Sequence, residues 1–284
     1  MSNKNKINKI NRSETMWAWE TIIMMLAVGY LTGLIAGIFG VGGGTILVPL
    51  VLWILQMQGL DGIAYAQHLA IGTTFAVMVF TSFSSMYSQH KKQAVDWEIL
   101  KSMIPGTLLG VAGGAVVAQY LPKTGLQIFF TVFIFILAVR ALMGVKPKPS
   151  RQLPGKKGLF GIGGLFGVLS SWIGIGGGSL TVPYLTFCNV PVHRAVGTSA
   201  ALGWPIAVAG AIGYWLAGLN AEGLPESASG FIYLPAVLVL AFATIIAAPT
   251  GVKLSHKLPA DKLKKGFGLL LLLIAVRMAW KIIA

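Results

Sequence analysis

A glycine-rich motif occurs twice in this chain of 284 residues and constrains its fold more than any other feature. Residues 40–49 read G-V-G-G-G-T-I-L-V-P and residues 174–183 read G-I-G-G-G-S-L-T-V-P, and the copies align without a gap. Three consecutive glycines interrupt a helix, because glycine loses the most backbone freedom when a helix forms. Each motif lies inside strongly apolar sequence, so it predicts a helix broken within an apolar region. In membrane proteins, helices broken at matching places in two halves indicate a transporter's binding site.

The composition predicts a multi-pass protein of the lipid bilayer. Hydrophobic residues make up 55% of the chain and charged residues 11%, whereas soluble domains carry about 25% charged residues. Several apolar runs are longer than the roughly 20 residues that cross a hydrocarbon core. The net charge of +14 comes from cations clustered in short segments between these runs. That distribution follows the positive-inside rule and argues against a nucleic-acid partner.

Ten apolar segments divide the chain into two halves. They cover roughly residues 17–39, 45–55, 66–88, 99–121, 126–143, 158–173, 179–188, 195–219, 231–254 and 265–284. The second and seventh are too short to span a bilayer and follow the glycine motifs directly, as parts of broken helices would. We therefore expect an all-α polytopic membrane protein with two homologous halves of about four to five helical segments each. Its expected parts are a basic tail (1–16), a first repeat (17–143), a cytoplasmic basic linker (144–158) and a second repeat (159–284).

The repeat continues beyond the glycine motifs. Residues 68–74 (H-L-A-I-G-T-T) match residues 193–199 (H-R-A-V-G-T-S), and Arg140 matches Arg277. An odd number of segments in each half predicts that the second half is inverted relative to the first. With the linker on the cytoplasmic side, the charged loops agree with this topology, except that the basic segment 4–12 would lie outside. A first half with one crossing fewer is the alternative.

The apolar segments lack acidic residues. None of the eight Asp and Glu residues lies in the middle of such a segment. Carriers coupled to protons or sodium often use a buried carboxylate, so a core without one favours an anion over a cation as the substrate. The sequence also shows no metal-ligand spacing, no cofactor-binding motif and no nucleophile–base pair. We therefore expect no metal, no cofactor and no enzymatic activity.

The glycine motifs could themselves bind an anion. A helix that resumes at Thr45 or Ser179 would expose unpaired backbone N–H groups and the positive end of its dipole. Both hydroxyls stand where a helix N-cap is expected, and both could donate to an anion. The glycines of the predicted binding site are Gly42, Gly43, Gly44, Gly176, Gly177 and Gly178. The alternative is that these glycines only allow helices to pack closely.

Four further hydroxyls recur in the repeat, at Thr73, Thr74, Thr198 and Ser199. They lie about a turn and a half inside their apolar segments. Hydroxyls at such a depth could hydrogen-bond an oxyanion without a fixed charge, which favours transit over trapping. They could equally bond the backbone of their own helices, as hydroxyls in membrane helices commonly do.

Two histidines and two arginines also recur in the repeat. His68 and His193 could couple transport to protons, because histidine changes charge near neutral pH. Alternatively, each could cap its helix at the membrane interface. Arg140 and Arg277 lie near the ends of their segments, where they could attract substrate to a vestibule or extend to the interface.

Both motifs resemble those of the TauE/SafE sulfite exporter family. The pattern G-x-G-G-G-[ST]-x-x-x-P, followed by H-x-x-x-G-T-[ST], fits both copies, and the resemblance covers roughly residues 20–284. It implies a permease of the bacterial or archaeal inner membrane that exports small anions, such as sulfite or organosulfur compounds like sulfoacetate. The signature positions would be residues 42–45 with Pro49 and residues 176–179 with Pro183. Bulky Trp172 enters only the second copy, so the two half-sites need not be equivalent.

Together, these patterns predict a secondary transporter that binds one small anion between its halves. Alternating access would come from one half rocking against the other. An anion channel with the same site and a membrane scaffold without flux are the alternatives. Assembly as a homodimer is left open by the sequence.

Overall fold

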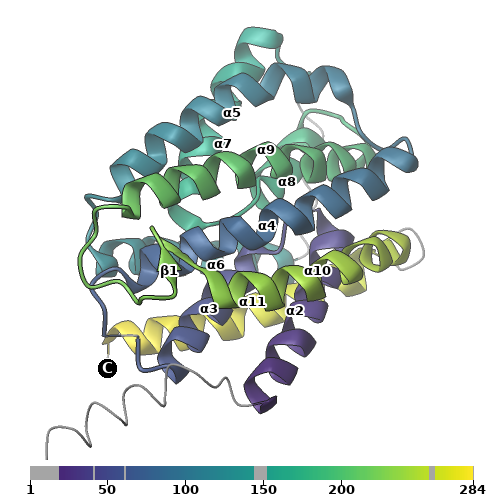
Figure 1. The fold of residues 1–284 in the computed structure, drawn as a ribbon. Coiled ribbons are helices and arrows are strands. Elements are labelled where there is room, and N and C mark those ends of the chain that lie inside the picture. Colours follow the sequence, from purple (N-terminus) through teal and green to yellow (C-terminus); the bar gives the residue numbers. More distant parts are fainter. Residues whose placement is uncertain (1–18, 41, 61, 144–151, 256–259, 284) are drawn as a thin grey trace, which may run out of the picture.

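A computed structural model describes residues 19–40, 42–60, 62–143, 152–255 and 260–283. Within these ranges the chain forms ten helices and one two-stranded hairpin (Figure 1). The first half contains α2 (Trp19–Phe39), α3 (Gly44–Met57), α4 (Ala66–Lys91), α5 (Trp97–Ala118) and α6 (Lys123–Leu142). The second contains α7 (Lys156–Ile173), α8 (Gly178–Phe187), α9 (Val192–Gly218), β1 (Ala228–Ser229), β2 (Ile232–Tyr233), α10 (Leu234–Ser255) and α11 (Ala260–Ile283).

The helices confirm the expected all-α polytopic class. Each of the ten expected apolar segments corresponds to one helix, with ends that differ by a few residues. Six helices are long and apolar enough to cross a membrane, namely α2, α4, α5, α6, α9 and α10. The expected basic tail (1–16) and most of the expected linker (144–151) lie outside the described residues, so their assignment stays a prediction.

The helices pack in a pattern that repeats between the halves. The repeat pairs α2 with α7, α3 with α8, α4 with α9, α5 with α10 and α6 with α11. In space, α4 and α9 lie side by side in the centre, with α5 and α7 on one side of them and α10 and α2 on the other (Figure 1). Helix α2 therefore packs on α10 of the other half, and its counterpart α7 packs on α5 in the same way. The two halves are intertwined rather than separate bodies.

Contacts between small residues give the relative directions of the outer helices. Residues 33–37 of α2 pack in order against residues 244–251 of α10, and residues 106–114 of α5 against residues 160–171 of α7. Both pairs are therefore parallel. Glycines at these contacts allow the two backbones of each pair to approach closely, which is how membrane helices commonly associate.

The central helices complete the pattern of directions. Gly72 of α4 packs against Tyr214 of α9, and Ser82 packs against Gly203, so α4 and α9 are antiparallel. The Thr81 hydroxyl of α4 donates to Thr244 Oγ1 of α10 over 2.6 Å, next to the α2 contact. Helices α2, α4 and α10 thus run in one direction, and their repeat partners run in the other. The corresponding inversion of topology in a bilayer stays a prediction.

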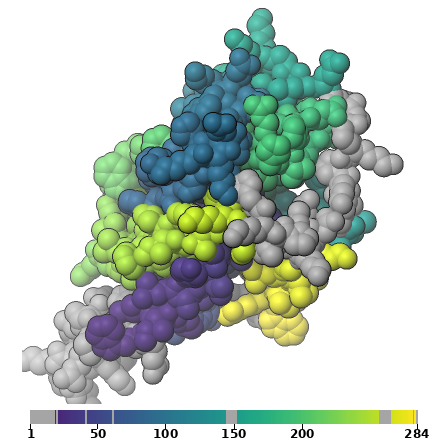
Figure 2. All heavy atoms as spheres, turned by 90° about the vertical axis from the view of Figure 1, so that its right-hand side faces the viewer, coloured from purple at the N-terminus to yellow at the C-terminus, as the bar shows by residue number. Residues whose placement is uncertain are grey.

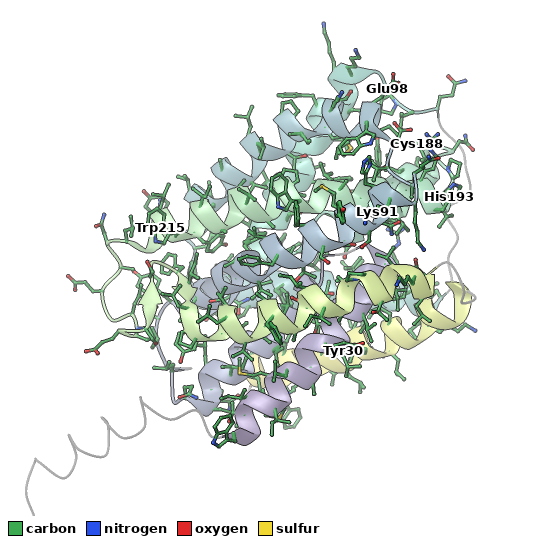
Figure 3. All side chains as sticks on the ribbon, turned by 45° about the vertical axis from the view of Figure 1, so that its right-hand side comes forward. Tyr30, Lys91, Glu98, Cys188, His193 and Trp215 are labelled. Carbon is green, nitrogen blue, oxygen red and sulfur yellow. The ribbon has the colours of Figure 1, made fainter. Side chains whose placement is uncertain are left out.

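The two ends of the helix bundle differ in charge and in loop length. At one end, which we call the basic end, α4 is joined to α5 by residues 92–96, and exposed lysines gather at Lys91, Lys92, Lys156, Lys157 and Lys253. Figure 2 looks onto this end, and Figure 3 shows Lys91 and His193 there. At the opposite end, which we call the hairpin end, α9 is joined to α10 by the longer segment 219–233. Trp215 lies toward that end (Figure 3).

Candidate functional site

The two glycine motifs meet in the middle of the molecule. A Cβ atom at Gly42 would lie 3.4 Å from the Cα of Gly176, and a Cβ atom at Gly44 would overlap the backbone of Gly174. The same Cβ on Gly42 would lie 3.2 Å from Ser82 Oγ, near the middle of α4. Only residues without a side chain allow the two chains to cross this closely. We call this contact the glycine crossing; it joins residues 42–44 to residues 174–178.

Each short helix begins directly at the glycine crossing. The Gly43 carbonyl accepts hydrogen bonds from the backbone N–H groups of Ile46 (3.1 Å) and Leu47 (3.0 Å), so Gly43 is the N-cap of α3. Gly177 caps α8 in the same way. The expectation that the Thr45 and Ser179 hydroxyls act as N-caps is therefore wrong. Thr45 and Ser179 are the second residues of their helices, and the N-cap of each helix is the glycine two positions earlier.

Hydroxyls at the crossing are buried and have no hydrogen-bond partner in the described part of the chain. They are Thr45 Oγ1, Ser179 Oγ and Thr181 Oγ1, and Thr45 and Thr181 are fully buried. Buried polar groups in proteins are nearly always hydrogen-bonded. Three buried hydroxyls without a described partner at one place therefore indicate a site for a hydrogen-bond acceptor.

Two of the predicted hydroxyls join helices instead. The Tyr233 N–H donates to Thr73 Oγ1 over 2.8 Å, just before α10. In the other half, the Asp96 N–H donates to Thr198 Oγ1 over the same distance, just before α5. These equivalent bonds lie at opposite ends of the bundle. The oxygens of Thr73 and Thr198 thus connect helices, and no described contact brings them to the glycine crossing.

The neighbouring hydroxyls behave differently. Thr74 Oγ1 and Ser199 Oγ are fully buried and lack a hydrogen-bond partner among the described groups. Since α4 and α9 pack on each other, both hydroxyls lie in the central layer that also holds Ser82. Their assignment to substrate binding stays a prediction.

The described core carries no formal charge. Its buried polar side chains include Ser, Thr, Gln and His, but no Asp, Glu, Lys or Arg within the described residues. Asp96 is half-buried at the basic end, 3.7 Å from Arg194, whereas Glu98, Glu222 and Glu226 are exposed. Among the described residues, no group of three His, Cys, Asp or Glu side chains could hold a metal ion. A neutral core with free donors lets an anion bind without competition from carboxylates.

The sequence of the chain matches a known family. The family model of sulfite exporter TauE/SafE matches residues 25–278. The chain belongs to the TauE/SafE family. It is similar to a probable membrane transporter protein of Haemophilus influenzae, with 32% identity over 92% of this chain and 98% of the relative.

More distant relatives carry the same description. They include probable membrane transporter proteins of Methanocaldococcus jannaschii (26% identity over 85% of this chain and 89% of the relative) and Bacillus subtilis (YdhB, 26% over 85% and 94%). No solved structure matches the chain. With its six candidate spans, this member of the TauE/SafE family is a multi-pass membrane transporter.

The two histidines of this TauE/SafE protein lie in different environments. His68 is 1% exposed, and its Nε2–H donates to the Ala118 carbonyl over 2.9 Å at the hairpin end. Its ring lies 5.6 Å from that of Tyr65 and 5.2 Å from that of Phe231. His193 is exposed at the basic end. The histidines are thus equivalent in sequence but not in structure, and a shared role in proton coupling stays a prediction.

The two arginines lie away from the glycine crossing. Arg140 is exposed in the last turn of α6. Arg277 is exposed on α11, where it borders a pocket of about 280 Å³ between α2, α3, α6 and α11. Most of this pocket is apolar, and Gln56 and Gln127 are its other polar members. A gating role for either arginine stays a prediction.

Sequence reasoning missed two hydroxyls at the crossing. Thr181 lies two residues after Ser179, but its repeat counterpart is Leu47, so a comparison of the two copies hides it. Ser82 lies in a group of hydroxyls within an apolar helix, at residues 81, 82, 84, 85 and 88. Such a group inside a membrane span is an available signal for a polar path.

Proposed function

We propose that this TauE/SafE transporter exports a small oxyanion, sulfite or an organic sulfonate, and binds it at the glycine crossing. The buried hydroxyls of Thr45, Ser179 and Thr181, which lack a partner among the described residues, carry this proposal, together with the absence of buried carboxylates from the described core. Each would donate a hydrogen bond to an oxygen of the anion. Hydrogen bonds to charged groups contribute about 1.5–3 kcal/mol each.

Neutral donors suit transport better than a fixed cation would. A lysine or arginine at this depth would hold the anion tightly, whereas hydroxyls and helix-end amides replace its hydration without a full opposite charge. A location in the inner membrane of a bacterium or archaeon is part of the proposal.

Binding and flux of sulfite test the proposal directly. Purified protein would be titrated calorimetrically with sulfite, methanesulfonate, thiosulfate, sulfate, acetate and chloride, and flux would be measured in proteoliposomes. We expect the sulfur oxyanions to bind. The double variant Thr45→Val/Ser179→Ala should weaken sulfite binding by at least about tenfold, since 1.4 kcal/mol corresponds to a factor of ten.

Thr131→Val is the matched control for the double variant. Thr131 is buried in α6, but its hydroxyl donates to the Gln127 carbonyl of its own helix over 2.7 Å. Its substitution should leave sulfite affinity unchanged. Unaltered sulfite affinity in the double variant would refute the proposed site. Flux that does not saturate with sulfite would favour a channel over a carrier.

A further inference from the structure

A stripe of buried polar side chains on α4 extends beyond the glycine crossing. Ser82, Ser85 and Gln89 follow one another at intervals of three and four residues, so they share one face of the helix. They are 1%, 2% and 1% exposed. Ser82 Oγ, Ser85 Oγ and Gln89 Oε1 have no hydrogen-bond partner in the part of the chain that the structure describes. Because an unpaired polar group is costly to bury, such a row needs a ligand or water.

The stripe connects the crossing to the basic end. Ser82 Oγ lies beside Gly42, at the start of the stripe. Seven residues of helix carry the stripe about 10 Å further, to Gln89. Lys91 follows directly and is exposed (Figure 3). An anion at the crossing therefore has polar groups beside it along the route to the lysine-rich end.

The equivalent face of α9 is closed to a polar ligand. In the alignment of His68 with His193, the counterparts of Ser82, Ser85 and Gln89 are Ala207, Gly210 and Tyr214. Gly210 packs closely against the ring of Phe75. The Tyr214 hydroxyl donates to the Ser171 carbonyl over 2.8 Å, and the Tyr214 ring lies 5.9 Å from that of Phe75.

Phe231 adds a further layer at the hairpin end. It lies between β1 and β2, is 1% exposed, and its ring is 6.4 Å from that of Tyr214 and 5.2 Å from that of Tyr65. In the other half, the equivalent connection at the basic end is shorter, because residues 92–96 join α4 to α5 directly. The aromatic side chains thus pack on the hairpin side of the crossing, where Gln67 and Thr74 are also buried without a described partner, and the polar stripe lies on the basic side.

We propose that Ser82, Ser85 and Gln89 form a second anion subsite, which receives the same small oxyanion between the crossing and the basic end. The hydroxyls donate directly, and the Gln89 amide presents its NH2 group after a half-turn about its last side-chain bond. This subsite rests on the proposed function. It also assigns the basic end as the side from which the anion reaches the subsite, and Phe75, Tyr214 and Phe231 as the closed side.

Cysteine labelling tests the subsite in the full-length protein. In a Cys188→Ser background, Ser85→Cys would be exposed to an anionic, membrane-impermeant methanethiosulfonate from one side of proteoliposomes at a time. Exposed Lys253→Cys reports which side is the basic end. We expect Ser85→Cys to react from the basic end, and sulfite to slow the reaction at least about fivefold.

Thr81→Cys is the matched control on the neighbouring face of α4. The Thr81 hydroxyl bonds Thr244 in the contact between α4 and α10, whereas Ser85 has no described partner, so the cysteine at position 81 should not react. Equal labelling at positions 81 and 85, labelling of Ser85→Cys from the hairpin end, or labelling without protection by sulfite would each overturn the subsite. If the unlabelled protein neither binds nor transports sulfite, the proposed function fails instead. The side from which Ser85→Cys is labelled does not depend on sulfite, so it tests the subsite separately.

A second measurement separates binding from folding. Ser82→Ala/Ser85→Ala should weaken sulfite binding by about tenfold. The thermal midpoint should not fall, since the removed hydroxyls have no protein partner. A lower midpoint with unchanged sulfite affinity would show that the stripe is only structural.

Discussion

The two halves of the molecule share their construction but differ where a substrate would pass. In both, a long helix ends in a glycine motif, a short helix follows, and a threonine of the next helix accepts a backbone N–H of the other half. Thr73 of α4 accepts from the residue just before α10, and Thr198 of α9 accepts from the residue just before α5. The first half then places Ser82, Ser85 and Gln89 on its central helix, whereas the second places Ala207, Gly210 and Tyr214 there. A binding site between two symmetric halves can open to one side of the membrane only if the halves differ. We therefore interpret the contacts that both halves share as part of the common fold, and the contacts found in one half as features of the present conformation.

A similar difference surrounds the short helices. Leu50 of α3 borders the pocket beside Arg277. Its counterpart in α8 is Tyr184, whose ring packs edge-on against Phe166 at 5.6 Å. Larger side chains therefore occupy the equivalent position in the second half. The inequivalence of the two half-sites, which Trp172 suggested, stays a prediction.

The strongest test of the symmetric construction removes its shared hydrogen bonds. Thr73→Val and Thr198→Val should each lower the free energy of unfolding by about 1–3 kcal/mol, because each leaves a backbone N–H without its acceptor. Sulfite affinity should not change. Chemical denaturation in detergent, with calorimetric titration of sulfite, checks both effects. A loss of affinity without a loss of stability would instead support the sequence-based prediction that these hydroxyls bind substrate.

The histidines test an asymmetric position. His68→Leu should cost about 1–3 kcal/mol of stability, since the buried Ala118 carbonyl loses its donor. His193→Leu should change stability by less than about 0.5 kcal/mol, because His193 is exposed. Thermal unfolding of both variants measures the difference. Equal losses would mean that the histidines have equivalent surroundings after all.

The left-handed position of the glycine crossing gives a further test. Gly43 has a φ of 85°, so Gly43→Ala should lower the free energy of unfolding by about 1–2 kcal/mol for the left-handed backbone. Chemical denaturation in detergent measures this loss, and an unchanged free energy of unfolding would contradict it.

The arginines should show the smallest effect. Arg140→Gln and Arg277→Gln should each change the free energy of unfolding by less than about 0.5 kcal/mol, because both side chains are exposed. If either arginine attracts the substrate, its variant should slow sulfite flux at low ionic strength and not at high ionic strength. Flux that is independent of salt in both variants would leave interface anchoring as their role.

Much of the fold could be predicted from particular patterns in the sequence. The length of the apolar runs predicted the helices, and the glycine motifs predicted where α2 and α7 end and where α3 and α8 begin. The site was less predictable. The Thr45 and Ser179 hydroxyls were expected to cap their helices. The cap position depends, however, on which backbone carbonyl accepts the first hydrogen bond of the helix. Burial of His68 depends on Phe231, which is 163 residues away along the chain and belongs to an insertion without a counterpart.

The sequence by itself determined the class of protein, the division into two halves and the breaks in their helices, because apolar length and glycine runs act locally along the chain. Only the tertiary structure decided that the two motifs cross, that Thr73 and Thr198 join helices, and that buried aromatic rings gather on one side of the crossing while the polar stripe of α4 lies on the other. These outcomes depend on which faces of α4 and α9 are in contact. The packing of helices that are distant in the sequence determines those faces, and the sequence repeat alone does not.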